Sequence, residues 1–498
     1  MATIHNAWIT YSNASSVTLS ATTKRSDTEA NEAIKAVVSR YADIAGDSEA
    51  FAASLAHTLA PCVWAHPLRL TRDRLAILLA EENISSAPVE WSDNALRLDV
   101  NSRPGLTWLY RAGLMQTQEE AAMLSVRLLD PQPGEHILDL CAAPGNKTAQ
   151  IATALGNRGT IVANDRKVGR LAPLHAVLSR LGLMNVTTTA HNGITYPAEN
   201  GSFDKVLADV PCSGEGTIRK GVGKHKPVSD AFRYWLNGAQ HALLNRATDL
   251  CRPGGRIVYS TCTIAPEENE AIIDRILTER PNDLRVVAAS VPGLKTSPGV
   301  TRWRDRSYCS ETSRAIRLWP HLTDTSGFFA VLLERTGGPD DAPNPGVPAS
   351  PSNTPRASLE NFIDRFGLPG TIFDQSKLIG DGNQRRLVAD DHRPPKKPPA
   401  MATGLALTRD KAKPPKLSTQ AALVFGGGAT RNVIDLQRDE VDIYMDRGSI
   451  PLAGDRVSAC DGPGHVVTRY QGFALGIAGL RGGDGNWMLD SLFPKGRG

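Results

Sequence analysis

The sequence lacks any apolar run long enough to cross a membrane. The longest runs, residues 421–425 and 328–333, are far shorter than the roughly 20 residues that a membrane-spanning helix needs. The first five residues also lack the basic region and apolar stretch of a secretory signal. We therefore expect a cytoplasmic protein with no membrane partner.

Cysteine is scarce and odd in number, at seven of 498 residues. Scattered cysteines in a chain of this length do not form a disulfide framework. A reducing compartment, in which a special cysteine is catalytic rather than structural, fits this pattern. The net charge is only +4, which permits an anionic partner without requiring one. Hydrophobic residues reach 41%, which excludes a wholly disordered chain.

Strand-like and helix-like segments alternate between residues 104 and 334, and this alternation predicts a doubly wound α/β sheet with parallel strands. In such a sheet, ligands bind at the carboxyl ends of the strands. The expected strands are 135–140, 160–164, 185–190, 203–209 and 255–260, and the expected helices are 147–155, 167–181 and 230–251.

The flanking regions differ in composition. Residues 27–98 carry apolar residues at helical spacing, which predicts a small, mainly helical domain. The basic, proline-rich run 385–416 is either a solvated linker or a contact surface for an anionic partner. Short alternating segments after residue 433 predict a small all-β module, with strands at 456–458, 465–470, 473–477 and 487–490.

These shifts define six expected regions. Because the expected active site lies in one of them, a chain ending near Arg335 should still bind its cofactor. The regions are a loose tail (1–26), a helical extension (27–103), the α/β domain (104–335), a linker rich in Pro, Gly and Ser (336–357), an accessory basic segment (358–432) and a β module (433–498).

The first chemical motif is Asp-Leu-Cys-Ala-Ala-Pro-Gly-Asn-Lys-Thr at 139–148. Small residues let the backbone approach a ligand closely, and the following helix N-terminus offers free N–H groups. A nucleotide-like ligand or an ordinary turn would both suit this pattern, which is neither a Walker loop nor G-x-G-x-x-G.

Two polar residues follow the next two expected strands. Asp165 could hold ribose hydroxyls or cap a helix, and Asn192 could contact an adenine edge or form a turn before Gly193. Together with the first motif, they indicate an adenosine-containing cofactor across the carboxyl edge of the sheet.

Two cysteines, Cys212 and Cys262, end the fourth and fifth strands, and Asp209 lies three residues before the first. A cysteine becomes an efficient nucleophile once its thiolate is populated. Each thiol could instead be a small buried hydrophobic side chain. Two thiols without a nearby histidine do not make a zinc site, so we expect no metal.

Several motifs together resemble the Sun (NSUN) family of RNA cytosine-5 methyltransferases. They are 139–148, Asp-x-Pro-Cys-Ser-Gly-x-Gly at 209–216, Ser-Thr-Cys-Thr at 260–263, Glu-Glu-Asn-Glu at 267–270, Trp-Pro-His at 319–321, Gly-Phe-Phe at 327–329 and the lead-in pair Gln118 and Glu119. More weakly, residues 47–99 resemble the N-terminal helical extension of that family. Residues 469–473 resemble the PUA-like tail of the bacterial ribosomal RNA methyltransferase F group.

The resemblance implies a Rossmann-like class I methyltransferase domain with a mostly parallel seven-stranded sheet, a helical N-terminal extension and a C-terminal PUA-like module. It implies S-adenosylmethionine as cofactor, with Asp165 on the ribose and Asn192 and Asp209 completing the pocket. Asp165 stands where Glu is usual, Asn192 where Asp is usual, and Asn146 where Gly or Ser is common. The implied cofactor loop is Cys141, Ala142, Ala143, Pro144, Gly145, Asn146 and Lys147.

The resemblance also assigns Cys262 as the nucleophile and Cys212 as the cysteine that helps resolve the covalent intermediate. Carbon 5 of cytosine is a poor nucleophile, so thiolate attack at carbon 6 creates an enamine that can take a methyl group. Asp209 would hydrogen-bond the base edge. Lys147 either steadies a ligand or is a solvated helix lysine. We expect a monomer acting on RNA, ribosomal rather than transfer RNA; the rival hypothesis is a non-catalytic RNA-binding factor.

Overall fold

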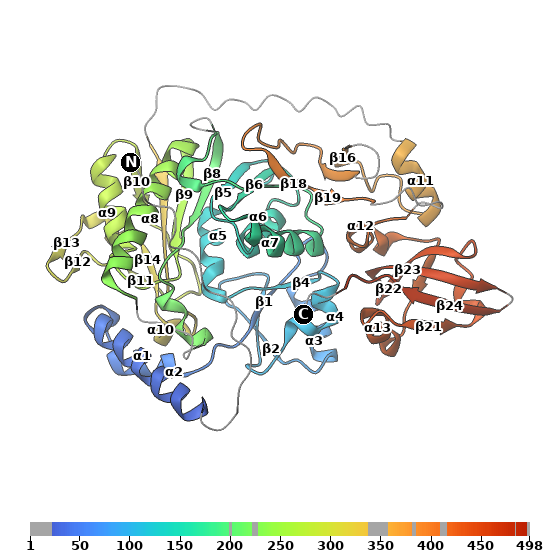
Figure 1. Cartoon of the computed structure of the whole chain (residues 1–498), viewed down its shortest axis with the longest axis horizontal. Coiled ribbons are helices and arrows are strands. Elements are labelled where there is room, and N and C mark those ends of the chain that lie inside the picture. The colour runs from blue at the N-terminus through green and yellow to red at the C-terminus, as the bar shows by residue number, and fades with distance from the viewer. Residues whose placement is uncertain are drawn as a thin grey trace.

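The computed structural model describes residues 22–198, 202–221, 228–336, 357–380, 385–408, 416–483 and 485–495. Its centre is a sheet in the order β11-β14-β15-β9-β8-β5-β6-β7-β18, with β10 paired to β15. Figure 1 shows α1 and α2 at one end of the molecule and the C-terminal sheet at the other. Among the described helices, none has the length and apolar character of a membrane span.

The five central strands are parallel, and their buried side chains follow the predicted apolar runs. All five predicted strands and all three predicted helices are present, with β6 and β8 at the predicted bounds. The strands are β5 (His136–Asp139), β6 (Thr160–Asn164), β7 (Val186–Thr189), β8 (Phe203–Asp209) and β9 (Cys251–Thr261), and the helices beside them are α5 (Leu124–Leu129), α6 (Asn146–Ala154), α7 (Val168–Leu181), α8 (Asp230–Leu250) and α9 (Glu270–Glu279).

The sheet has ten strands rather than the predicted seven. On one side it continues through antiparallel strands, and on the other β18 pairs antiparallel with β7. An uncovered edge strand would leave a row of backbone N–H and C=O groups unpaired, which these additions avoid. The added strands are β10 (Leu284–Val287), β11 (Ser297–Pro298), β14 (Ile316–Leu318), β15 (Phe328–Arg335) and β18 (Ala400–Thr403), with β12 (Arg302–Trp303), β13 (Arg306–Ser307) and α10 (Pro320–Thr323) nearby.

Strand β18 comes from the basic, proline-rich run, so the described part of that run is not a solvated linker. The same segment supplies two strands of a small sheet that also contains β16. Residues 381–384 and 409–415 of this region, and all of 337–356, lie outside the described residues. The small sheet consists of β16 (Ser376–Ile379), β17 (Arg386–Ala389) and β19 (Leu405–Ala406).

The N-terminal region is helical only in part, and the prediction of a mainly helical domain is wrong from β1 onward. The four residues of β1 are all buried, and a short apolar run carries no period that separates strand from helix. The region contains α1 (Thr22–Ala45), α2 (Ser48–Ala56), α3 (Arg72–Glu81) and α4 (Trp108–Arg111), and an antiparallel sheet of β2 (Ser86–Pro88), β3 (Ala95–Leu98), β1 (Cys62–Ala65) and β4 (Met115–Thr117).

The C-terminal module is a five-stranded sheet with a helix, so the all-β prediction is wrong at α13. A capping box between Gln437 and Glu440 begins that helix. Residues 456–458, predicted as a strand, overlap the 3₁₀ turn Gly454–Val457. The elements are α11 (Ala357–Phe366), α12 (Thr419–Phe425), α13 (Arg438–Met445), β20 (Val433–Asp435), β21 (Ser449–Leu452), β22 (Gly464–Tyr470), β23 (Phe473–Gly483) and β24 (Asn486–Ser491).

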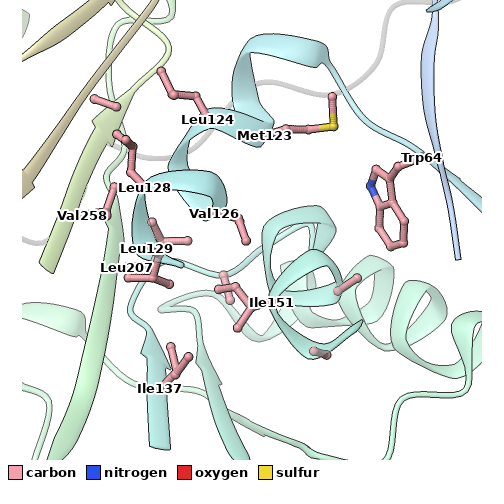
Figure 2. Close-up of a cluster of buried hydrophobic side chains, with 14 of the residues drawn as sticks. Trp64, Met123, Leu124, Val126, Leu128, Leu129, Ile137, Ile151, Leu207 and Val258 are labelled. Atoms are coloured by element: carbon pink, nitrogen blue, oxygen red, sulfur yellow. The ribbon is translucent and has the colours of Figure 1, made fainter. Parts of the chain in front are cut away.

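Two cores position the site. In the first, Leu128 and Leu129 of α5 pack toward Leu207 and Val258 of the central sheet (Figure 2). The second is shared between the N-terminal sheet and the C-terminal module, where the Trp108 and Tyr470 rings meet edge to face at 5.0 Å. The C-terminal module is therefore built onto the rest of the chain.

Candidate active site

The two cysteines that end adjacent strands come together. Parallel pairing places Asp209 of β8 opposite Ser260 of β9, so the segments that follow leave the sheet side by side. The Sγ atoms of Cys212 and Cys262 lie 3.3 Å apart, and both residues are partly buried.

The two cysteine-bearing loops are fastened to each other. The Gly216 N–H donates to the Cys262 carbonyl over 3.0 Å, and the Ser213 N–H donates to Glu268 Oε2 over 2.9 Å. A Cβ at position 216 would lie 2.1 Å from the Gly327 carbonyl oxygen, so only glycine allows this approach. The thiols are thus held by a rigid backbone frame.

The two thiols differ in acidity. A hydrogen bond from Cys212 lowers the pKa of Cys262, and the ammonium groups of Lys147 and Lys220 act in the same direction against burial and Asp209. The pKa of Cys212 is raised well above its usual range by its hydrogen bond to Cys262 and by burial. Cys262 is therefore the more acidic thiol of the pair, and Cys212 is the less acidic one.

Asp209 and Lys147 form a second pair beside the thiols. Lys147 Nζ lies 2.8 Å from Asp209 Oδ2, and Ser260 Oγ donates to Asp209 Oδ1 over 2.8 Å. Burial disfavours the lysine charge, but the Asp209 carboxylate outweighs it and raises the pKa of Lys147. Its side chain is only 15% exposed, so the interpretation of Lys147 as a solvated helix lysine is wrong.

A cavity of about 250 Å³ connects Cys262 and the Asp209–Lys147 pair to the loop after β5, whereas Cys212 lies behind Cys262 and does not line it. Gly145 has φ +108°, and a Cβ there would lie 2.6 Å from Leu174 Cδ1, which fixes glycine at this turn. Of the predicted site residues, Cys141, Ala142, Ala143, Pro144, Asn146, Lys147, Asp209 and Cys262 line the cavity.

Asp165 and Asn192 do not line this cavity. Asp165 is buried behind the loop, where its carboxylate accepts from the Ala143 and Lys167 N–H groups over 3.3 and 3.0 Å and pairs with Arg170. Asn192 accepts from the Ile194 N–H over 3.2 Å, which is the turn-forming alternative. The structure therefore brings the cysteines, Asp209 and the loop together, while Asn192 stands apart.

Asp139 is a pocket residue that sequence reasoning did not single out. It is 1% exposed, and Thr148 Oγ1 donates to its Oδ2 over 2.6 Å, while Oδ1 has no hydrogen-bond partner among the described residues. Burial raises the pKa of Asp139 to about 7. The sequence signal that could have identified Asp139 is its position at the end of the first predicted strand, where ligands bind in such a sheet.

Other lining residues were also not predicted as site residues, among them Glu119, Lys220 and Phe328. Lys147 Nζ lies 5.6 Å from the centre of the Phe328 ring, a cation–π contact that helps hold the lysine. Lys220 is on a 3₁₀ turn that follows the Cys212 motif, and its position at the cavity depends on a turn geometry that spacing does not reveal.

Comparison with known proteins gives consistent results. Residues 126–334 match the family model described as 16S rRNA methyltransferase RsmB/F. A tRNA (cytosine(49)-C(5))-methyltransferase from Pyrococcus abyssi is 36% identical over 305 residues, covering 60% of this chain and 96% of that protein. Ribosomal RNA small subunit methyltransferase F from Erwinia tasmaniensis is 29% identical over 432 residues, covering 82% and 85%.

Solved structures agree with the fold. The crystal structure of a methyltransferase homologue protein from Pyrococcus horikoshii is 30% identical and has a TM-score of 0.53. The match covers 60% of this chain and 94% of that one.

Proposed function

The chain belongs to the RsmB/F family of RNA cytosine-C5 methyltransferases, which is the Sun (NSUN) family that its motifs resemble, and from this premise we propose that it methylates cytosine through a covalent adduct on Cys262. The observation that carries the proposal is the 3.3 Å contact between the Cys212 and Cys262 sulfurs. This contact lies beside Asp209 and Lys147, which line one cavity together with Cys262.

Cys262 starts the reaction in this proposal. Its thiolate adds to carbon 6 of cytosine, which turns carbon 5 into a nucleophile. The hydrogen bond that lowers the pKa of Cys262 supports this role because it keeps the thiolate populated. Asp209 and its partner Lys147 face the edge of the base, where negative charge develops during the attack.

S-adenosylmethionine, when bound, supplies an electrophilic methyl group on a sulfonium. The residues present suit such a ligand: the loop after β5 is made of small residues, and the unpartnered Asp139 Oδ1 lines the cavity. The loop 141–147 would hold it. Asp165 and Asn192 are proposed for the adenosine end, and Asp165 would have to exchange Arg170 or a backbone N–H for a ribose hydroxyl.

Cys212 is proposed to act after methyl transfer. The proton on carbon 5 must then leave so that the bond between Cys262 and carbon 6 can break. While Cys262 carries a thiolate, its proximity keeps the pKa of Cys212 high. Once Cys262 is bonded to the base, that interaction is lost and the pKa of Cys212 falls, so Cys212 can release its own proton to solvent and its thiolate can then take the proton from carbon 5.

Ribosomal RNA is the proposed substrate. Two proteins named ribosomal RNA small subunit methyltransferase F match 82% and 84% of this chain, and two others of that name match 59% and 60%. The relative named as a tRNA methyltransferase matches only 60%. We propose that the C-terminal module is a PUA-like element and that it binds RNA phosphates together with the basic run 385–416.

Bisulfite sequencing of cellular RNA with and without this protein tests the proposal. We expect at least one ribosomal RNA cytosine to lose its protection when the protein is absent or carries Cys262→Ala. Protection lost only in transfer RNA would move the substrate to that class. No lost protection anywhere would favour the non-catalytic RNA-binding hypothesis.

A further inference from the structure

Three side chains connect α7 to the cofactor loop in series: Arg180, Gln116 and Asn146. Arg180 Nη2 donates to Gln116 Oε1, and Gln116 Nε2 donates to Asn146 Oδ1 over 2.7 Å. Gln116 lies on β4 and is only 2% exposed. Water therefore does not compete for these bonds.

Arg180 is itself fixed in place. Its Nη1 donates to the carbonyls of Tyr110 and Met115 over 2.6 and 3.0 Å. Its guanidinium carbon lies 3.7 Å from the centre of the Tyr110 ring. Burial lowers the pKa of Arg180 only to about 10, so the group remains a cation at neutral pH.

The cation sets the direction of both amides. A guanidinium has donors and no acceptor, so Gln116 must turn its oxygen toward Arg180. Gln116 then has only its NH₂ group to offer Asn146, whose oxygen must accept. Asn146 Nδ2 is left as the free end, without a protein partner among the described residues, on a residue that lines the cavity.

The surroundings of Asn146 indicate which ligand group the free amide meets. Asn146 is the first residue of α6, where the backbone N–H groups of the first turn favour an anion. On the same cavity, the unpartnered Asp139 Oδ1 suits a cation. An amino-acid zwitterion has both groups.

We infer that Asn146 Nδ2 donates to the carboxylate of the methionine part of S-adenosylmethionine, and that Gln116 and Arg180 are positioning residues that hold this donor outward. The inference rests on the proposed function. It also gives a role to Asn146, at a position where the resembling family usually has Gly, which has no side chain, or Ser, which has no amide N–H to present to the ligand.

Reversing the direction of the hydrogen bond between Gln116 and Asn146 tests the inference without changing the shape of either side chain. Gln116→Glu presents a carboxylate to both neighbours, so Asn146 must turn its NH₂ inward and its oxygen toward the ligand carboxylate. We expect the dissociation constant for S-adenosylhomocysteine to rise about tenfold or more. Binding of 5′-methylthioadenosine, which has no carboxylate, should change less than about twofold.

These dissociation constants are measured by titration calorimetry, and two further variants of the full chain complete the experiment. Asn146→Asp should show the same selective loss. Gln150→Glu adds an equal charge to the same helix while keeping the oxygen that accepts from Gln118, and it should bind both ligands normally.

If Gln116→Glu and Asn146→Asp weakened the binding of both ligands equally, the inference would be overturned, because equal weakening would indicate a distorted loop. The inference would also be overturned if neither variant weakened the binding of S-adenosylhomocysteine. If the unmodified protein bound neither ligand, the proposed cofactor itself would be refuted, and the inference with it. Binding of 5′-methylthioadenosine reports that each variant is folded.

Discussion

At the residue scale, the two thiols differ because one donates a hydrogen bond to the other. Cys212→Ala removes the donor, so the pKa of Cys262 should rise toward its ordinary value and less thiolate should remain at pH 7. We expect alkylation of Cys262 by iodoacetamide at pH 7 to slow about tenfold. Cys212→Ser, which keeps a donor, should slow it much less.

Peptide mass spectrometry reads out each cysteine separately. Cys309 is an internal control, because burial raises its pKa and it has no contact with the pair. Its alkylation rate should be the same in all variants. Unchanged alkylation of Cys262 in Cys212→Ala would show that Cys212 does not set its acidity.

Sequence spacing predicted the cysteines, Asp209 and the cofactor loop because each follows the end of a parallel strand. The same logic could not decide between a ligand contact and a turn for Asn192, whose side-chain oxygen caps its own turn. Lys147 was left undecided because its partner Asp209 lies 62 residues further along the chain. Pairings of that kind depend on the completed sheet rather than on any local pattern.

At the element scale, helices and central strands were predictable because helical apolar periods alternate along the chain with short, continuous apolar runs. The covering strand β18 was not, since it pairs with a strand more than 200 residues away in sequence. Strand β1 was not predictable either, because its sequence is a short apolar run that does not distinguish a strand from a helix. Proline and basic residues suggested an extended linker, whereas the described part of that run joins the central sheet.

The loop before β18 allows a test of RNA binding. Lys396 and Lys397 are exposed there, whereas Lys411 and Lys413 of the same basic run lie outside the described residues. If the first two contact phosphates, replacing both with Gln should weaken cognate and unrelated RNA equally. The slope of log affinity against log salt should fall by about 0.7 to 0.9 per contact.

Affinity measured across a salt series checks this prediction. Lys295, exposed near β11, provides a matched Lys→Gln control outside the basic run. An unchanged slope and affinity for the Lys396→Gln, Lys397→Gln variant would mean that this loop serves only to place β18.

At the scale of the whole molecule, the C-terminal module is part of the fold. Sequence reasoning predicts that a chain ending near Arg335 keeps its cofactor site. The structure changes that expectation, because the truncation removes β18 and half of the core that contains Trp108 and Leu109. We expect such a chain to melt about 10 °C or more below the full chain and to bind S-adenosylmethionine more weakly.

Thermal denaturation with and without ligand tests this prediction. Arg438→Ala is a suitable control, since it removes the ion pair to Glu82 across the same interface and the ion pair to Asp442 within α13, and a partly exposed pair contributes about 1 kcal/mol or less. Equal melting temperatures for the truncated and full chains would show that the shared core does not support the catalytic domain.

The central claim is the division of labour between Cys262 and Cys212. The most direct measurement is a denaturing gel of Cys212→Ala after incubation with substrate RNA and S-adenosylmethionine. We predict a protein–RNA adduct that accumulates because release is impaired more than attack, that disappears with ribonuclease and that is absent when Cys262→Ala is added. The account would be contradicted if no adduct formed under conditions where the parent enzyme turns over, or if Cys262→Ala alone still transferred methyl groups at a substantial rate.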